Sequence, residues 1–323
     1  MESFLAPQIE YLLILQNFRQ LSGGVLDNFF MFITSCGEIT IPVILTAGIY
    51  WCINSKYGLY IFWNWCVGMI ACQFLKSLAC IYRPWVLDTR IQPIPEAFRM
   101  SGGYSFPSGH TQTAVAIWGS MAVVFKNKLF RAAMILLILL IAFSRNYIGV
   151  HTPQDVITSL VLGCVMLFLI SKLMKWVENG KNRDIILLSA VYLSAVLLIG
   201  YEHFKSYPMD YIGGNLLVDP QKMVLYSFPK IGLYLGIFTG WFITNRWVKF
   251  DGSVGTKLEK VIRFIVGAAI LTLISTQSTT IFSTVVSKKT TMFLTSFLSS
   301  LFVLTIYPWL VIMFRKFVSK REN

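Results

Sequence analysis

His151 and Asp155 stand at a spacing that suits nucleophilic chemistry. Asp155 follows His151 by four residues. Its carboxylate could accept the Nδ1–H of His151, which would fix the ring tautomer, leave Nε2 free to attack, and stabilise the positive charge that the ring then acquires. The same stretch also suits a helix start, with Thr152 as N-cap, Pro153 in the first position and Asp155 in the third. The two roles are compatible, because one carboxylate can serve both.

A second cluster, Pro107-Ser108-Gly109-His110, follows the glycine-rich turn Ser101-Gly102-Gly103. Gly109 lets backbone N–H groups approach an anion, and a helix start offers unpaired N–H donors and the positive end of the dipole. His110 would then lie beside a phosphate site. As a short string, the cluster is also compatible with a plain turn from loop to helix.

Three cations accompany these clusters. Lys76 and Arg83 are seven residues apart, which places them on one helix face two turns apart, and Pro84 ends that helix. Arg145 precedes His151 by six residues. A lysine inside a membrane span is costly and is usually functional, although its long side chain can also reach the interface.

The composition indicates that membrane helices position these residues. The chain of 323 residues is 55% hydrophobic and only 13% charged, with a mean hydropathy of +0.64. Soluble domains carry about 25% charged residues, so a soluble core is excluded. The 25 Phe, 14 Tyr and 9 Trp residues exclude a disordered chain. A net charge of +13 would suggest nucleic acid in a soluble protein, whereas in a membrane protein it marks cytoplasmic loops.

We therefore predict an all-α polytopic membrane protein with about nine transmembrane helices. A span must cross about 30 Å at 1.5 Å per residue. The candidate stretches are residues 26–53, 57–82, 109–125, 129–147, 154–177, 184–200, 223–246, 258–282 and 290–314. Residues 26–53 are interrupted by Gly37 and Pro42 and are taken as one kinked helix, with two shorter pieces as the alternative.

The predicted domains follow from these spans. Residues 1–25 form an N-terminal interfacial helix, which Pro7 opens and which runs to Leu21 with charged residues among its apolar ones. Residues 26–200 form a core of six spans, and residues 201–323 add three further helices.

The positive charges predict the sidedness of these spans. Of the 28 Lys and Arg residues, 17 fall in loops on one side, 9 on the other, and Lys76 and Arg145 inside spans. The side with more cations is expected to be cytoplasmic, with the N-terminus outside and the C-terminus inside. The segments with Lys76, His110 and His151 then all reach the outer face, although the motifs were found without reference to topology.

Three motifs together resemble the signatures of the type 2 phosphatidic acid phosphatase family. They are Lys76 through Arg83-Pro84, YSFPSGH at residues 104–110, and Ser144-Arg145 through His151 to Asp155. The family includes lipid phosphate phosphatases, undecaprenyl pyrophosphate phosphatases, sphingosine phosphate phosphatases, glucose-6-phosphatase and vanadium haloperoxidases. Every motif position is matched. The predicted nine spans resemble the sphingosine phosphate and glucose-6-phosphate branches, a comparison that rests on span counting.

The resemblance implies a catalytic mechanism. His151 would attack phosphorus and become a phosphohistidine, Asp155 would support it, and His110 would protonate the leaving oxygen and then activate water. Phosphate-binding roles are implied for Lys76, Arg83, Ser108, Gly109 and Arg145. We find no residues at metal-ligand spacing in the sequence, and we expect a metal-independent enzyme without a cofactor.

The expected substrate is a lipid phosphate or polyprenyl pyrophosphate whose tail stays among membrane lipids. The alternatives are a sugar-phosphate phosphatase of the glucose-6-phosphatase type and a non-catalytic protein that binds or transports phospholipid. No nucleic acid partner is expected, and a bacterial plasma membrane is the expected location.

Three further features of the sequence also carry expectations. The six cysteines include no CxxC pair and are interpreted as apolar packing residues. His203 is interpreted as a solvated loop residue, with substrate contact as the alternative. Residues 85–106 form a long loop that either shapes a headgroup pocket or serves as a structured connection.

Overall fold

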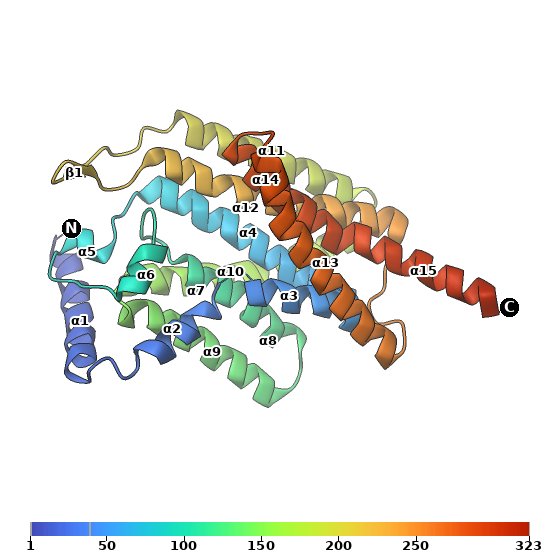
Figure 1. Ribbon diagram of the computed structural model, residues 1–323, viewed down its shortest axis with the longest axis horizontal. Coiled ribbons are helices and arrows are strands. Elements are labelled where there is room, and N and C mark those ends of the chain that lie inside the picture. Colours follow the sequence, from blue (N-terminus) through green and yellow to red (C-terminus); the bar gives the residue numbers. More distant parts are fainter. Residues whose placement is uncertain (1, 39, 323) are drawn as a thin grey trace. The chain divides into compact units, whose positions relative to one another are not determined.

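Helices form nearly all of the regular structure in the computed structural model, which describes residues 2–38 and 40–322 (Figure 1). Met1, Ile39 and Asn323, which belong to the predicted N-terminal segment, first span and C-terminus, lie outside the described residues. The first half of the chain contains α1 Glu2–Leu21, α2 Asp27–Ser35, α3 Thr40–Gly48, the π-helix η1 Ile49–Ile53, α4 Ser55–Ala79, α5 Pro84–Leu87, α6 Pro95–Met100, α7 Gly109–Ala114, η2 Val115–Gly119, α8 Ser120–Val124, α9 Lys128–Tyr147 and α10 Pro153–Glu178.

The second half is equally helical apart from one small hairpin. Strands β1 Tyr211–Ile212 and β2 Asn215–Leu216 pair antiparallel. The helices are α11 Arg183–Phe204, α12 Pro220–Ile243, η3 Thr244–Val248, α13 Lys257–Ser283, α14 Lys288–Leu301, η4 Phe302–Ile306 and α15 Tyr307–Glu322.

The chain forms two compact units. The first unit comprises Met1–Pro42, Gly68–Phe168 and Glu202–Val224, and the second comprises Val43–Val67, Leu169–Tyr201 and Leu225–Asn323.

Five helical segments are long and apolar enough to cross a membrane. They are Ser55–Leu87, Lys128–Tyr147, Pro153–Glu178, Arg183–Phe204 and Lys288–Ser319. Each corresponds to one of the predicted spans. Helices α12 and α13 also cover predicted spans, 223–246 and 258–282, but do not belong to these five. The helical, membrane-spanning class is therefore confirmed, and a count of nine stays a prediction.

The range predicted as one kinked span, 26–53, is two helical pieces, so the one-helix interpretation was wrong. Helix α2 ends at Ser35, and α3 begins at Thr40. The turn between them contains Gly37, where an added Cβ would lie 2.9 Å from a methyl carbon of Ile141 on α9. Close packing of this turn against α9 thus requires a residue without a side chain.

The predicted span 109–125 is a short helical run that is buried within the first unit. Helix α7 continues through the π-turn η2 into α8, which ends at Val124. All five residues of η2 are buried, and α7 and η2 both pack against α9. Protein thus surrounds η2, and all five of its residues are apolar.

Helix α1 begins earlier than predicted, because Pro7 lies inside it and not at its start. One face buries Ile9 and Leu12 against Ile91. Figure 1 shows α1, in dark blue, beside the short helix α5. The opposite face leaves Ile14 and Phe18 exposed, an arrangement suited to a helix that lies on a bilayer surface.

In the second unit, glycines allow close helix packing. An added Cβ at Gly232 or Gly236 of α12 would clash with the backbone oxygen of Phe293 or Phe297 on α14. Small residues at such positions let two helix backbones approach, which is a common way for membrane helices to associate.

The long loop 85–106 is a structured connection that α1 holds in place. Arg19 of α1 is buried and donates from Nη2 to the Gln92 carbonyl at 2.5 Å and from Nη1 to the Tyr147 carbonyl at 3.5 Å. Gln16 exchanges two further bonds with the backbone of Arg90 and Gln92. One face of α1 therefore joins the loop to the end of α9.

We predict that Arg19→Ala lowers the free energy of unfolding by about 1–3 kcal/mol, because buried carbonyls lose charged donors. Thermal unfolding of the purified protein in detergent measures the change. Gln20→Ala removes the exposed neighbour and is the matched control. Equal stability of the two variants would contradict the anchoring role of Arg19.

Candidate active site

All eight residues singled out from the sequence lie in the first unit. They come from helix ends and the segments beside them. Lys76 is in the last turn of α4 and Arg145 in that of α9, while Asp155 is in the first turn of α10. The others are Arg83 just before α5, Ser108 as the N-cap of α7, Gly109 and His110 at its start, and His151 in the turn before α10.

His151 is held at both ring nitrogens. Its side chain is only 2% exposed. Nε2 lies 3.0 Å from Nη1 of Arg83, and because a guanidinium can only donate, Nε2 must be the acceptor. The ring proton is therefore on Nδ1, which lies 3.1 Å from Oδ2 of Asp155 and 3.2 Å from Oγ of Ser105. This is the tautomer that leaves an electron pair on Nε2.

Asp155 caps a helix and holds the histidine with the same oxygen. Its Oδ2 accepts from the backbone N–H of Thr152 at 2.9 Å, while Thr152 Oγ1 accepts from the N–H of Asp155 at 3.4 Å. Oδ2 also accepts from the Ser105 hydroxyl at 2.5 Å. Helix α10 starts at Pro153, as the sequence indicated. The capping interpretation and the histidine-supporting one thus both describe the geometry.

Arg83 is buried and donates to three backbone carbonyls as well as to His151. Nε and Nη2 donate to Gly103 and Gly102 at 3.2 and 3.0 Å, and Nη1 donates to Val150 at 2.9 Å. Gly103 has a φ of 68°, a backbone conformation that side-chain-bearing residues rarely adopt. The glycine-rich turn is therefore folded so that its carbonyls surround a cation.

Lys76 is held in the same way by the next residues along the loop. Its Nζ donates to the carbonyls of Tyr104 and Ser105 at 2.9 and 2.8 Å. Ser105 is also tied to the chain after α4, because its N–H donates to the Ile81 carbonyl at 2.7 Å. Ser105 thus orients Lys76 through its backbone carbonyl and His151 through its side-chain hydroxyl.

Arg145 is buried and bonds to Thr34 of α2. Nη1 donates to the Thr34 hydroxyl at 2.6 Å, and Nε has no hydrogen-bond partner among the described residues. A buried, unsatisfied guanidinium N–H is costly, and such groups in native proteins call for an explanation. An anion that accepts from Nε would satisfy it.

The Ser108-Gly109-His110 segment starts α7, as expected. Ser108 Oγ accepts from Thr111 N at 3.4 Å and from Thr111 Oγ1 at 3.0 Å. Neither bond uses the proton of Ser108 itself. An added Cβ at Gly109 would meet nothing within 4 Å, so there is open space beside this backbone. The His110 ring has no hydrogen bond in the described part of the chain.

Two residues that bond to the predicted site residues were not predicted from the sequence. Ser105 lies within the YSFPSGH string, so its position was noticed but its role was not. Thr34 is 111 positions away from Arg145 and carries no local signal. His203, by contrast, lies in the last turn of α11, not in the predicted loop, and is exposed.

Positive charge dominates the surroundings of His151. Burial in the protein, followed by the charges of Arg83, Arg145 and Lys76, lowers the pKa of His151 well below 6.5. The ring is therefore neutral, the form that can attack. Within residues 2–38 and 40–322, no group of three His, Cys, Asp or Glu side chains could share a metal ion.

This combination defines a class of site. A neutral, oriented imidazole stands among buried cations at the end of membrane-spanning helices, which is suited to transfer of a phosphoryl group.

Comparison with known proteins identifies the family. The PAP2 superfamily model matches residues 57–179, and the model for the transmembrane extension of PAP2 superfamily phosphatases matches residues 228–320. Undecaprenyl-diphosphatase BcrC of Bacillus subtilis is 32% identical over 151 residues, which are 46% of this chain and 74% of that protein. The chain belongs to the PAP2 superfamily.

A second relative is more distant. Lipid A 4'-phosphatase of Porphyromonas gingivalis is 25% identical over 170 residues, 49% of this chain and 72% of that protein. No solved structure matches the chain. The resemblance to the type 2 phosphatidic acid phosphatase family is thus confirmed, and both of these relatives are bacterial phosphatases.

We predict that Ser105→Ala lowers kcat about 10- to 100-fold, the loss expected when one hydrogen bond to a charged group no longer orients a reacting ring. Ser105 is a positioning residue, so KM should change by less than about threefold. Steady-state phosphate release measures both constants.

The matched control for this prediction is Ser120→Ala. Ser120 is also fully buried, but its hydroxyl has no hydrogen-bond partner among the described residues. Its loss should leave kcat unchanged. A similar fall in kcat for both variants would show that removal of any buried hydroxyl has this effect, and would refute the role of Ser105.

We also predict a bell-shaped pH dependence of kcat/KM, because one histidine must be neutral and the other protonated. Protonation of His151 blocks attack, and the lowered pKa of its ring places that loss of activity at a pH well below 6.5. A pH profile of kcat/KM tests this. An acid limb at or above pH 6.5 would contradict the assignment.

Proposed function

We propose that the protein removes phosphate from a lipid phosphate or polyprenyl pyrophosphate through a phosphohistidine at His151. The observation that carries this proposal is the buried imidazole with Nδ1 3.1 Å from Asp155 and Nε2 3.0 Å from Arg83. Membership of the PAP2 superfamily supports a phosphatase, and the names of both relatives describe enzymes that act on lipid or polyprenyl phosphates.

In the proposed reaction, Nε2 of His151 forms a bond to phosphorus as the bond to the leaving oxygen breaks. His110 gives its proton to that oxygen. A water molecule then attacks the phosphohistidine, His110 takes up its proton, and inorganic phosphate is released with His151 restored. Asp155 stabilises the positive imidazole in the intermediate.

The phosphate oxygens would be bound by the cations around His151. An ionised phosphate oxygen is a stronger acceptor than a backbone carbonyl, so it competes well for the donors of Arg83 and Lys76. Nε of Arg145 has no acceptor among the described residues, so a phosphate oxygen would supply one. The hydroxyl of Ser108 and the N–H of Gly109 would add neutral donors. Three fixed cations would supply the charge stabilisation that other phosphatases obtain from metal ions, so we propose metal-independent catalysis.

We further propose that the site faces the extracytoplasmic side of a bacterial plasma membrane. The distribution of Lys and Arg supports this orientation, with the N-terminus outside and the C-terminus in the cytoplasm. In this proposed topology the chain has nine spans. Residues 1–25 form an interfacial segment, residues 26–200 form the core, and residues 201–323 add three further helices. The exposed Ile14 and Phe18 of α1 support the interfacial segment.

A soluble sugar phosphate is the second candidate substrate. The span count motivates it, whereas the relatives favour a lipid. A non-catalytic protein that binds or transports phospholipid would need the cations but not a histidine with a fixed tautomer.

We predict that His151→Ala abolishes both phosphate release and trapping of a phosphoenzyme. The measurement is phosphate release by the purified protein from phosphatidate, undecaprenyl pyrophosphate and glucose 6-phosphate, with and without a chelator. We expect turnover of a lipid substrate that the chelator does not reduce. His203→Ala, which removes an exposed histidine, should remain active.

The outcomes separate the candidate functions. A fully active His151→Ala variant would refute the phosphohistidine mechanism. Release only from glucose 6-phosphate would favour the sugar-phosphate enzyme, and release from none of the substrates would favour the binding protein.

A further inference from the structure

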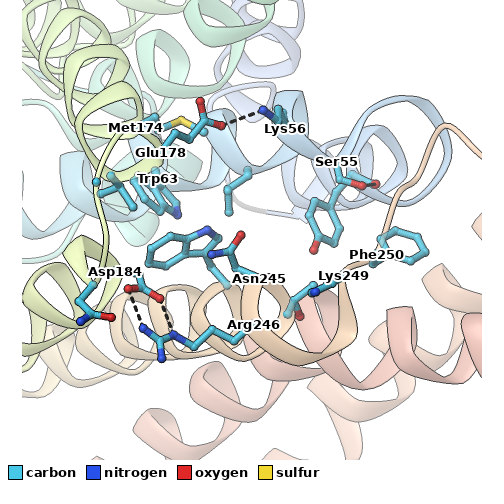
Figure 2. Close-up of a pocket in the computed structure, with 17 residues that line it drawn as sticks. Ser55, Lys56, Trp63, Met174, Glu178, Asp184, Asn245, Arg246, Lys249 and Phe250 are labelled. Atoms are coloured by element: carbon cyan, nitrogen blue, oxygen red, sulfur yellow. Dashed lines mark hydrogen bonds and ion pairs between the residues drawn. The ribbon is translucent and has the colours of Figure 1, made fainter.

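The second unit contains a cavity that the phosphatase site does not use. Its volume is about 700 Å³, within the range typical of small-molecule sites. It lies at the ends of several helices, with Lys56 in the first turn of α4, Glu178 at the last residue of α10, and Asp184 in the first turn of α11. Figure 2 shows its side chains. We call it the headgroup cavity.

The position of the headgroup cavity matches the surface of a bilayer. Helices α4, α10 and α11 belong to three of the five membrane-crossing segments, and all three begin or end at the cavity. Lys56 and Lys76 lie 20 positions apart on α4, or about 30 Å at 1.5 Å per residue. Lys56 and Lys76 therefore lie at opposite ends of this helix.

The charges of the headgroup cavity leave one cation in excess. Arg246 donates to both oxygens of Asp184 at 2.6 and 2.9 Å, and Lys56 pairs with Glu178 at 2.9 Å. Figure 2 shows these two pairs on opposite sides of the space. Lys249 is the third cation, and no ion pair of the described residues includes it. Two of the cations are thus neutralised, and the third favours an anion.

The walls of the headgroup cavity are suited to an amphiphile. Trp63, Trp241 and Leu59 line it beside the charged groups. Trp63 is only 1% exposed, yet its Nε1 donor has no acceptor in the described part of the chain. Buried indole N–H groups normally find a partner. A hydrogen-bond acceptor carried by a ligand would supply one.

We propose that the headgroup cavity binds the phosphate headgroup of an anionic phospholipid, from the leaflet at which α4 begins. The phosphate would contact Lys249 and Asn245, while the glycerol ester region would accept from Trp63 and pack on the aromatic walls. Basic cavities between membrane helices are common sites for anionic headgroups. Such a lipid would bind at a place separate from the substrate.

Native mass spectrometry of the full-length protein in detergent tests this proposal, with phosphatidylglycerol, phosphatidylcholine and glycerol phosphate as probes. We expect the wild-type protein to retain one phosphatidylglycerol in preference to the other two. Lys249→Gln should weaken that binding at least about tenfold. The backbone of Lys249 has a φ of 52°, and glutamine tolerates it no worse than lysine does.

Matched variants keep the result interpretable. Lys257→Gln removes an exposed lysine that does not line the cavity and should bind as the wild type does. Lys249→Arg should keep the binding. Phosphatase activity of each variant reports folding. Trp63→Phe keeps an aromatic ring, although a smaller one, and removes the N–H, so it should weaken binding even if Lys249→Gln fails to fold.

Three results would overturn the proposal. The first is unchanged phosphatidylglycerol binding in the folded Lys249→Gln or Trp63→Phe variant. The second is equal retention of phosphatidylcholine, which would show that the anionic headgroup is not recognised. The third is equal affinity for glycerol phosphate, which would identify a site for a free phosphate ester instead of a lipid.

Discussion

Burial of the Arg83 guanidinium beside a neutral histidine is the constraint on which the rest of the site depends. A buried charge must be surrounded by hydrogen-bond partners. The carbonyls of Gly102, Gly103 and Val150 supply them, and these lie in two different loops. The loops must therefore converge on one point, and their convergence brings His151 within 3.0 Å of the same cation.

Helix ends complete the electrostatics of the site. Lys76 and Arg145 lie in the last turns of α4 and α9, where the negative end of the helix dipole stabilises a cation. Asp155 lies in the first turn of α10, and His110 in that of α7, where anions are favoured. These helix ends therefore favour the charged forms of Lys76, Arg145 and Asp155.

Local patterns predicted the parts of this site that depend on neighbouring residues. The start of α10 and the start of α7 follow from capping residues close in sequence, so both were predictable. The Arg145–Thr34 bond joins residues 111 positions apart, and no periodicity indicates it. Pro7 was misread as a helix start because proline is common at the first helical position, whereas here it is the sixth residue of α1. The predicted span 26–53 divides at a glycine whose packing partner, Ile141, is visible only in three dimensions.

The cations of the site donate hydrogen bonds to neutral groups, so their positive charge remains available to attract an anion. The acceptors bonded to Lys76, Arg83 and Arg145 include backbone carbonyls, a hydroxyl and the imidazole. A carboxylate in their place would neutralise the cations and compete with phosphate. The nearby carboxylate, Asp155, is already engaged by His151, Ser105 and Thr152 through Oδ2. The hydrogen-bond acceptors around these cations are thus weaker than an ionised phosphate. Burial, followed by the same positive charge, favours the neutral form of His151.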